Sequence, residues 1–107
     1  MSDWVDVAAE NSFVQGEKVK IDLDDVTKVV VVKLDDGFYA IENMCSHDQL
    51  PLGEGDIEGD EIICPFHDAR FCLKTGEVKA PPAYENIASF PTRVENGQVQ
   101  VRDDRWD

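Results

Sequence analysis

The pattern that most restricts the fold is a run of β-branched residues followed by an Asp-Gly turn. Residues 29–32 are four consecutive valines, which is typical of a strand that is buried on both faces. Asp36-Gly37 tolerates the positive φ angles of a tight hairpin turn, and residues 38–41 form a second apolar segment after it. The sequence therefore predicts a β-hairpin whose first strand lies inside the protein.

Two further turn signals predict hairpins later in the chain. Asn96-Gly97 and Gly59-Asp60 each lie between short runs of strand-forming residues. The expected strands are 56–58, 61–63, 90–95 and 98–102, with weaker signals at 4–7 and 19–23. No segment repeats apolar residues at helical spacing over ten or more positions. We therefore expect an all-β fold of mostly antiparallel strands.

Two segments lack this strand pattern and are predicted to be loops. Residues 43–55 contain Pro51 and two glycines, while residues 64–76 begin with Cys-Pro and end with Thr-Gly. Residues 80–83 include two consecutive prolines, which favour a rigid extended piece. The 107 residues suit one domain over positions 1–107.

The charge balance is strongly acidic and restricts the partners. The chain has 23 Asp plus Glu against 10 Lys plus Arg, a net charge of -13. This argues against nucleic acid, because phosphate contacts need clustered basic residues. The acidity is explained equally well by solubility and by steering toward a partner with a basic docking face.

The start of the chain has no basic region followed by an apolar core, and no apolar run reaches the roughly 18 residues of a membrane span. Three cysteines are too few and too irregularly spaced for a secreted disulfide scaffold. We therefore expect a cytoplasmic protein that does not enter membranes.

The motif that carries chemistry is a pair of Cys-His loops. Cys45-Ser46-His47 is followed, after sixteen residues, by Cys64-Pro65-Phe66-His67, and these two loops contain both histidines of the chain. Two thiolates and two imidazoles suit either a tetrahedral zinc ion or a dinuclear iron cluster. Structural zinc sites usually group like ligands on one turn, so one Cys and one His per loop favours the cluster over a structural zinc module.

At these residues the sequence resembles the Rieske [2Fe–2S] family, whose loops read Cys-x-His and Cys-x-x-His. The resemblance implies one cluster per chain, with Cys45 and Cys64 on one iron and His47 and His67 on the other. It also implies stacked antiparallel sheets with an inserted cluster-binding subdomain over about residues 43–83. In the family a proline-containing loop covers the cluster, a role that we expect for Pro81-Pro82.

Four positions depart from the membrane-bound respiratory members of that family. Leu50 and Phe66 stand where those proteins have disulfide-forming cysteines, so no loop disulfide is expected. Ala69 and Phe71 stand where they carry hydroxyl groups near the cluster sulfurs. Because hydrogen bonds to sulfur stabilise the reduced state, we expect a potential toward the low end of the Rieske range, on the order of -150 mV.

The resemblance extends over essentially the whole chain to Rieske ferredoxins of multicomponent oxygenases. It implies a monomeric electron carrier that shuttles single electrons from a flavin-dependent reductase to a terminal non-haem iron oxygenase, each with a basic docking face. A different possibility is a small subunit resembling that of assimilatory nitrite reductase. An enzyme is not expected, because both histidines would be bound to iron and no ligand position would be open to substrate.

Three residues near the motif are given ordinary roles. Cys72 lies in an apolar stretch and is expected to be a small core residue. Asp48 and Asp68 each follow a predicted ligand histidine and are expected to be solvated loop carboxylates. In the family the position of Asp68 is often a glycine.

Overall fold

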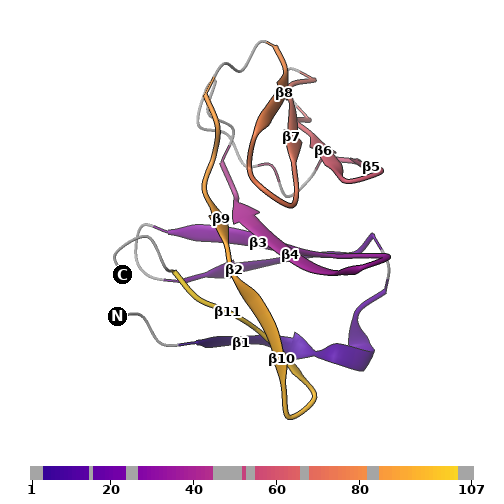
Figure 1. Ribbon diagram of the computed structural model, residues 1–107, viewed down its shortest axis with the longest axis vertical. Coiled ribbons are helices and arrows are strands. Elements are labelled where there is room, and N and C mark those ends of the chain that lie inside the picture. The colour runs from indigo at the N-terminus through magenta and orange to yellow at the C-terminus, as the bar shows by residue number, and fades with distance from the viewer. Residues whose placement is uncertain are drawn as a thin grey trace.

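Three antiparallel sheets lie one above another along the long axis of the computed structural model (Figure 1). The structure describes residues 4–14, 16–23, 27–44, 52, 55–65, 68–81 and 85–103. Sheet A has the order β1 (Val5–Ala9), β11 (Gln98–Val101), β10 (Thr92–Glu95). Sheet B has the order β2 (Lys18–Asp22), β3 (Lys28–Leu34), β4 (Gly37–Glu42), β9 (Ser89–Phe90). Sheet C has the order β5 (Ile57–Glu58), β6 (Glu61–Ile63), β7 (Arg70–Cys72), β8 (Val78–Ala80). A short 3-10 helix, η1 (Glu10–Ser12), follows β1.

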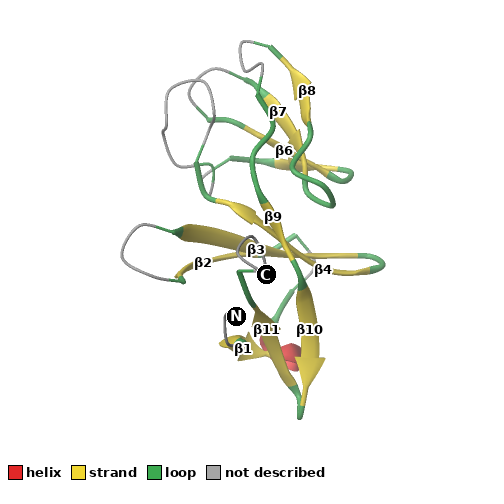
Figure 2. Cartoon of the chain, turned by 60° about the vertical axis from the view of Figure 1, so that its left-hand side comes forward, coloured by secondary structure: helices red, strands yellow, loops and turns green. Residues whose placement is uncertain are grey.

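Sheet C is inserted between two neighbouring strands of sheet B. Ala40 of β4 pairs with Phe90 of β9, whereas β5 to β8 all lie between these strands in the sequence. Figure 2 shows the chain leaving β4, forming the upper sheet and returning to β9. The prediction of stacked antiparallel sheets with an inserted unit is therefore confirmed. Sheet C spans residues 57–80, inside the bounds 43–83 that remain a prediction for the subdomain.

Strand β3 supplies side chains to both hydrophobic cores. Its even-numbered residues Val30 and Val32 face sheet C, and its odd-numbered residues Val29 and Val31 face sheet A, all four with no exposed surface. The upper core, named from its place in Figure 1, comprises Val30, Val32, Leu34, Ile41, Leu52, Ile62, Cys64, Ala69, Phe71, Leu73 and Ile87. The lower core comprises Phe13, Val29, Val31, Ala40, Phe90, Val99 and Val101. The predicted burial of this strand on both faces is confirmed.

The three predicted hairpins are present as β3–β4, β5–β6 and β10–β11. Asn96 and Gly97 both have positive φ angles, +52° and +78°, as a tight two-residue hairpin turn requires. Gly59 also adopts a positive φ, +62°. The weaker strand signals correspond to β1 and β2, with bounds shifted by one or two residues.

Two of the strand expectations are wrong. The single strand expected over 90–95 is divided at Pro91, so that β9 belongs to sheet B and β10 to sheet A. Proline has no amide hydrogen for a ladder, and here its carbonyl accepts a hydrogen bond from the Arg102 amide at 3.3 Å. Strand β7 lies within the segment 64–76 that was expected to be a loop. Its three residues are too few to show a clear alternation.

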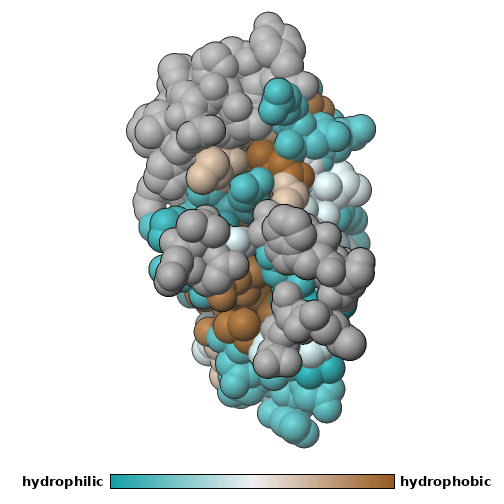
Figure 3. All heavy atoms as spheres, turned by 90° about the vertical axis from the view of Figure 1, so that its left-hand side faces the viewer, coloured by the Kyte–Doolittle hydropathy of each residue, from teal (hydrophilic) through white to brown (hydrophobic). Residues whose placement is uncertain are grey.

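Hydrophilic and apolar side chains of the described residues share the face that Figure 3 shows. Figure 3 shows apolar surface in a narrow, interrupted band on one face, with hydrophilic side chains beside it. Among the described residues, the large hydrophobic side chains counted as exposed are Val14, at 68%, and Val94, at 40%. In this part of the chain no helix has the length and apolar character that crossing a membrane requires.

Gly76 closes the turn that joins β7 to β8. Its amide donates to the Cys72 carbonyl at 2.8 Å, and its carbonyl accepts from the Ile87 amide at 2.9 Å. A Cβ at Gly76 would lie 2.0 Å from the Ile87 carbonyl oxygen. Gly97 has the same φ angle, +78°, but a Cβ there would meet no atom within 4 Å. The two glycines therefore differ in the space around them and not in φ.

We expect G76A to be far more destabilising than G97A. The strained φ alone costs about 1–2 kcal/mol in either variant, and G76A must in addition displace backbone, for a total on the order of 3 kcal/mol or more. Chemical denaturation followed by circular dichroism measures both losses. Similar losses in the two variants would contradict the close approach of Gly76 to Ile87.

Candidate metal centre

Cys64 is the predicted ligand whose surroundings the structure describes. It directly follows β6, and its side chain is fully buried in the upper core. Its thiol forms no disulfide. Leu52 and Ala69, both fully buried, belong to the same core. A group bound by this thiol would therefore have an apolar, water-poor side.

Two backbone hydrogen bonds join Cys64 to Asp68 and Ala69, which precede β7, and we call this connection the Cys64 turn. The Cys64 amide donates to the Ala69 carbonyl at 2.6 Å, and the Asp68 amide donates to the Cys64 carbonyl at 3.0 Å. Asp68 has a φ of +62°, the left-handed region that glycine adopts without strain. The two hydrogen bonds fix the backbone of Cys64 against the residues that lead into β7.

The end of the first predicted loop lies against the start of the second. Gly55 is buried, and its amide donates to the Leu52 carbonyl at 2.8 Å. A Cβ at Gly55 would lie 1.9 Å from the carbonyl oxygen of Ile63, the residue before Cys64. The Ile63 amide donates to the Asp56 carbonyl at 2.9 Å. Only a residue without a Cβ lets these two backbones approach so closely, which brings the bases of both loops together.

The other predicted ligands, Cys45, His47 and His67, lie outside the described residues, as do Asp48, Leu50 and Phe66. The ligand set therefore stays a prediction. No sequence signal other than the Cys-His spacing identifies it.

Two residues beside the Cys64 turn bear on the potential. Ala69 and Phe71 are fully buried in the same core as Cys64, and neither side chain can donate a hydrogen bond. This agrees with the expectation of a low potential, which stays a prediction.

Cys72 is only 7% exposed, so its expected burial is confirmed. It lies opposite Glu61 in the β6–β7 ladder, and its amide donates to the Glu77 carbonyl at 2.8 Å.

Ion pairs hold sheet C on two sides. Arg70 contacts Glu58 at 3.2 Å and Glu61 at 3.4 Å, and the hydrogen bonds that its guanidinium donates to these carboxylates raise the pKa of Arg70. Lys74 donates to Asp36 at 2.8 Å and so joins the β3–β4 turn to the turn after β7. This hydrogen bond lowers the pKa of Asp36, so the contact is present above the ordinary carboxyl pKa and is lost as the pH falls through the lowered value.

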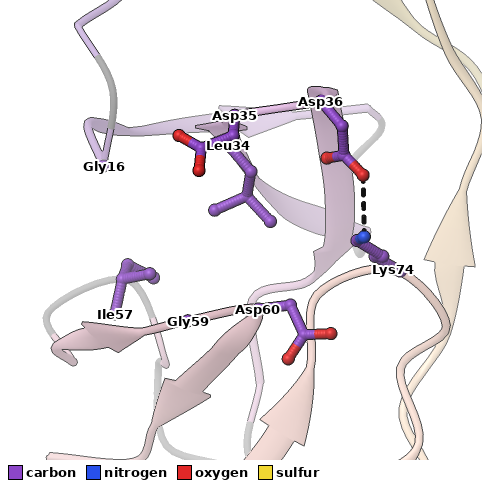
Figure 4. A pocket seen from close by; sticks show the side chains of 8 residues that line it. All are labelled: Gly16, Leu34, Asp35, Asp36, Ile57, Gly59, Asp60 and Lys74. Atoms are coloured by element: carbon purple, nitrogen blue, oxygen red, sulfur yellow. Dashed lines mark hydrogen bonds and ion pairs between the residues drawn. The ribbon is translucent and has the colours of Figure 1, made fainter.

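A cavity of about 630 Å³ lies beside this second ion pair (Figure 4). It is lined by the β3–β4 and β5–β6 turns, with Leu34 and Ile57 as apolar walls and Asp35, Asp36 and Asp60 as acidic groups. Asp60 precedes β6 and Cys64 follows it, so the cavity and Cys64 lie at opposite ends of that strand. The cavity is therefore separate from the predicted cluster site.

Residues 3–91 match the family model described as Rieske [2Fe-2S] domain. The chain therefore belongs to the Rieske [2Fe–2S] domain family. One curated relative of this Rieske protein is the biphenyl dioxygenase ferredoxin subunit of Pseudomonas sp. (strain KKS102). The two are 36% identical over 87 residues, which cover 80% of this chain and 79% of the relative.

Solved structures of ferredoxins have the same fold as this Rieske protein. The ferredoxin of carbazole 1,9a-dioxygenase from Nocardioides aromaticivorans IC177 superposes with a TM-score of 0.86 at 32% identity, covering 94% of this chain and 97% of that one. A chain in a complex of reduced oxygenase and oxidized ferredoxin of carbazole 1,9a-dioxygenase gives a TM-score of 0.87 at 32% identity, with 92% and 91% coverage. This Rieske protein is thus an electron carrier with a [2Fe–2S] cluster rather than an enzyme.

The observed surroundings of Cys64 fit such a cluster. A buried thiol that forms no disulfide and lies in an apolar core is what a thiolate ligand to an iron–sulfur cluster needs. The sequence supplies one more loop cysteine and two histidines for the remaining positions.

The positive φ of Asp68 yields a prediction about the second ligand loop. We expect D68G to be at least as stable as the parent, because glycine adopts this φ without strain, and D68A to lose about 1 kcal/mol. Chemical denaturation of the cluster-loaded proteins, followed by visible absorbance, measures the order. An alanine variant as stable as the glycine variant would argue against the observed backbone.

Proposed function

We propose that this Rieske protein is the ferredoxin component of an oxygenase system. It accepts single electrons from a flavin-dependent reductase and delivers them to a terminal non-haem iron oxygenase. The observation that carries the proposal is its end-to-end likeness to a ferredoxin of such a system, over 94% of this chain and 97% of the other. The complex of an oxygenase with a ferredoxin supports the oxygenase as the electron acceptor.

We further propose that the cluster is held by Cys45 and Cys64 on one iron and by His47 and His67 on the other. The cluster supplies one-electron redox chemistry when it is bound. Cys64 directly follows β6 and is fully buried, and its backbone is held by hydrogen bonds with Ala69 and Asp68. The apolar core around its thiol excludes water from that side, and we propose that electrons are exchanged through His47 and His67.

Charge supports docking through an acidic carrier surface and a basic partner surface. The net charge of -13 favours fast association with a cationic docking face, and this association weakens with salt. Large apolar side chains are sparsely exposed on the described residues, which favours a brief, charge-guided contact over a permanent one. On this basis we propose a monomeric carrier, and we also propose the cytoplasmic location that the sequence analysis expects.

The ligand assignment predicts opposite results for two buried cysteines. C64A should lose the cluster and its red-brown colour, because it removes one of the two thiolates that are proposed to bind the same iron. C72A is the matched control and should retain iron and sulfide in equal amounts, because Cys72 is a core residue. Metal and acid-labile sulfide analysis after anaerobic purification measures both. Retention of the full cluster by C64A would refute the assignment.

The partner assignment predicts rapid electron delivery to an oxygenase. Chemically reduced carrier should be reoxidised by a purified oxidised Rieske oxygenase in stopped-flow absorbance. The bimolecular rate should fall at least about tenfold between low and high salt, because the attraction between charges is screened.

Reduction of the carrier by NADH and a flavin-dependent reductase tests the other half of the proposal. The reductase alone, without carrier, is the control for direct transfer to the oxygenase. A cluster-loaded carrier that no such oxygenase reoxidises would end the assignment.

A further inference from the structure

Lys18 reaches from sheet B to the base of the cluster-binding loops. In the β2–β3 register it lies opposite Val32, whose side chain faces the upper core, so Lys18 is on the face of sheet B that meets sheet C. The lysine is partly buried, and its ammonium donates to the carbonyl oxygen of Gly55. A side chain of sheet B therefore holds Gly55, the residue that ends the first predicted loop.

Gly55 transmits this contact to the second loop. Its Cα approaches the Ile63 carbonyl so closely that no Cβ fits between them, and Ile63 precedes the buried Cys64. The Ile63 amide is itself bound by the Asp56 carbonyl, one residue after Gly55. Lys18, Gly55 and Ile63 thus form one continuous set of contacts that ends at a predicted ligand.

We propose that Lys18 is a positioning residue for the iron–sulfur centre. Lys18 fixes Gly55 against the loop that begins at Cys64 and holds a positive charge at that place. This inference rests on the proposed ligand set, because it takes Cys64 as a ligand of the cluster. It adds a residue from outside the two ligand loops to the machinery of electron transfer.

The charge is expected to matter because reduction adds a negative charge. A cluster of two ferric ions, two sulfides, two thiolates and two neutral imidazoles has no net charge, so its reduced form carries one negative charge. In a chain of net charge -13, a partly buried ammonium at the base of the predicted ligand loops opposes the unfavourable field. Among the described residues, the ammonium of Lys18 contacts the neutral carbonyl of Gly55, whereas that of Lys74 is paired with the Asp36 carboxylate.

Lys74 is therefore a matched control for Lys18. Both lysines join sheet B to sheet C, and replacing either removes one positive charge from the protein. Lys74, however, contacts the β3–β4 turn beside the acidic cavity, at the other end of sheet C from Cys64. A difference between the two variants reports position rather than net charge.

The test is the reduction potential of the cluster-loaded K18M, K18R and K74M proteins, measured by redox titration followed by EPR. K18M should lower the equilibrium constant for reduction about threefold relative to the parent, which is about 28 mV at 59 mV per tenfold change. K18R, which keeps the charge and the donor, should stay near the parent, and K74M should shift by less than half as much as K18M.

Other outcomes would overturn the inference. Loosened loops alone would admit water, which stabilises the charged reduced state and raises the potential of K18M instead of lowering it. Equal shifts of the reduction potential in K18M and K74M would show that only the net charge matters and not the position of Lys18. If K18M does not retain the cluster, K18Q keeps a donor to Gly55 without the charge and should show the same threefold fall.

The parent protein separates this inference from the proposed function. If the parent protein contains no cluster, both the ligand assignment and the role of Lys18 are refuted. A parent that is loaded and reduces an oxygenase, with K18M unchanged in potential, removes only the role of Lys18.

Discussion

The packing of β3 against two cores is the interaction on which the rest of the structure depends. Its alternate valines point to opposite faces of sheet B, so each face must be covered by another sheet. Sheet A covers one face and sheet C the other. Hydrophobic burial against β3 therefore holds sheet C, which leads into Cys64, in the same way as it holds sheet A.

That shared core also holds the bases of the two predicted ligand loops. These bases meet where Gly55 contacts Ile63, and the neighbouring residues Leu52 and Ile62 belong to the upper core. The Cys64 turn is closed by its own backbone hydrogen bonds. An electron carrier benefits from such a frame, because a cluster that moves little between its two redox states loses little energy to rearrangement.

Electrostatics have two separate roles in this molecule. Over long distances the large negative charge favours a cationic partner, while close to the cluster it opposes the arrival of an electron. Lys18 of sheet B lies at the base of the predicted ligand loops. The ion pair between Lys74 and Asp36 lies at the other end of sheet C. Both contacts also link sheet B to sheet C.

Local sequence was sufficient for elements whose signal lies within a few residues. The valine run, the Asp-Gly and Asn-Gly turns and the spacing of Cys45, His47, Cys64 and His67 predicted the hairpins, the all-β class and the Rieske family, because turn geometry and ligand chemistry are local properties. The short strand β7 was missed, since three residues make a strand only when β6 and β8 pair with them.

Tertiary structure alone decided where these pieces meet. It placed the two sides of Pro91 in different sheets, and it brought Lys18 to Gly55, 37 residues away in the chain. Such contacts depend on how the sheets stack, and no periodicity or composition encodes the neighbour that a distant residue will have. The sequence by itself therefore determined the family and the ligand set predicted for the centre, and the stacking of sheets B and C determined the surroundings of Cys64.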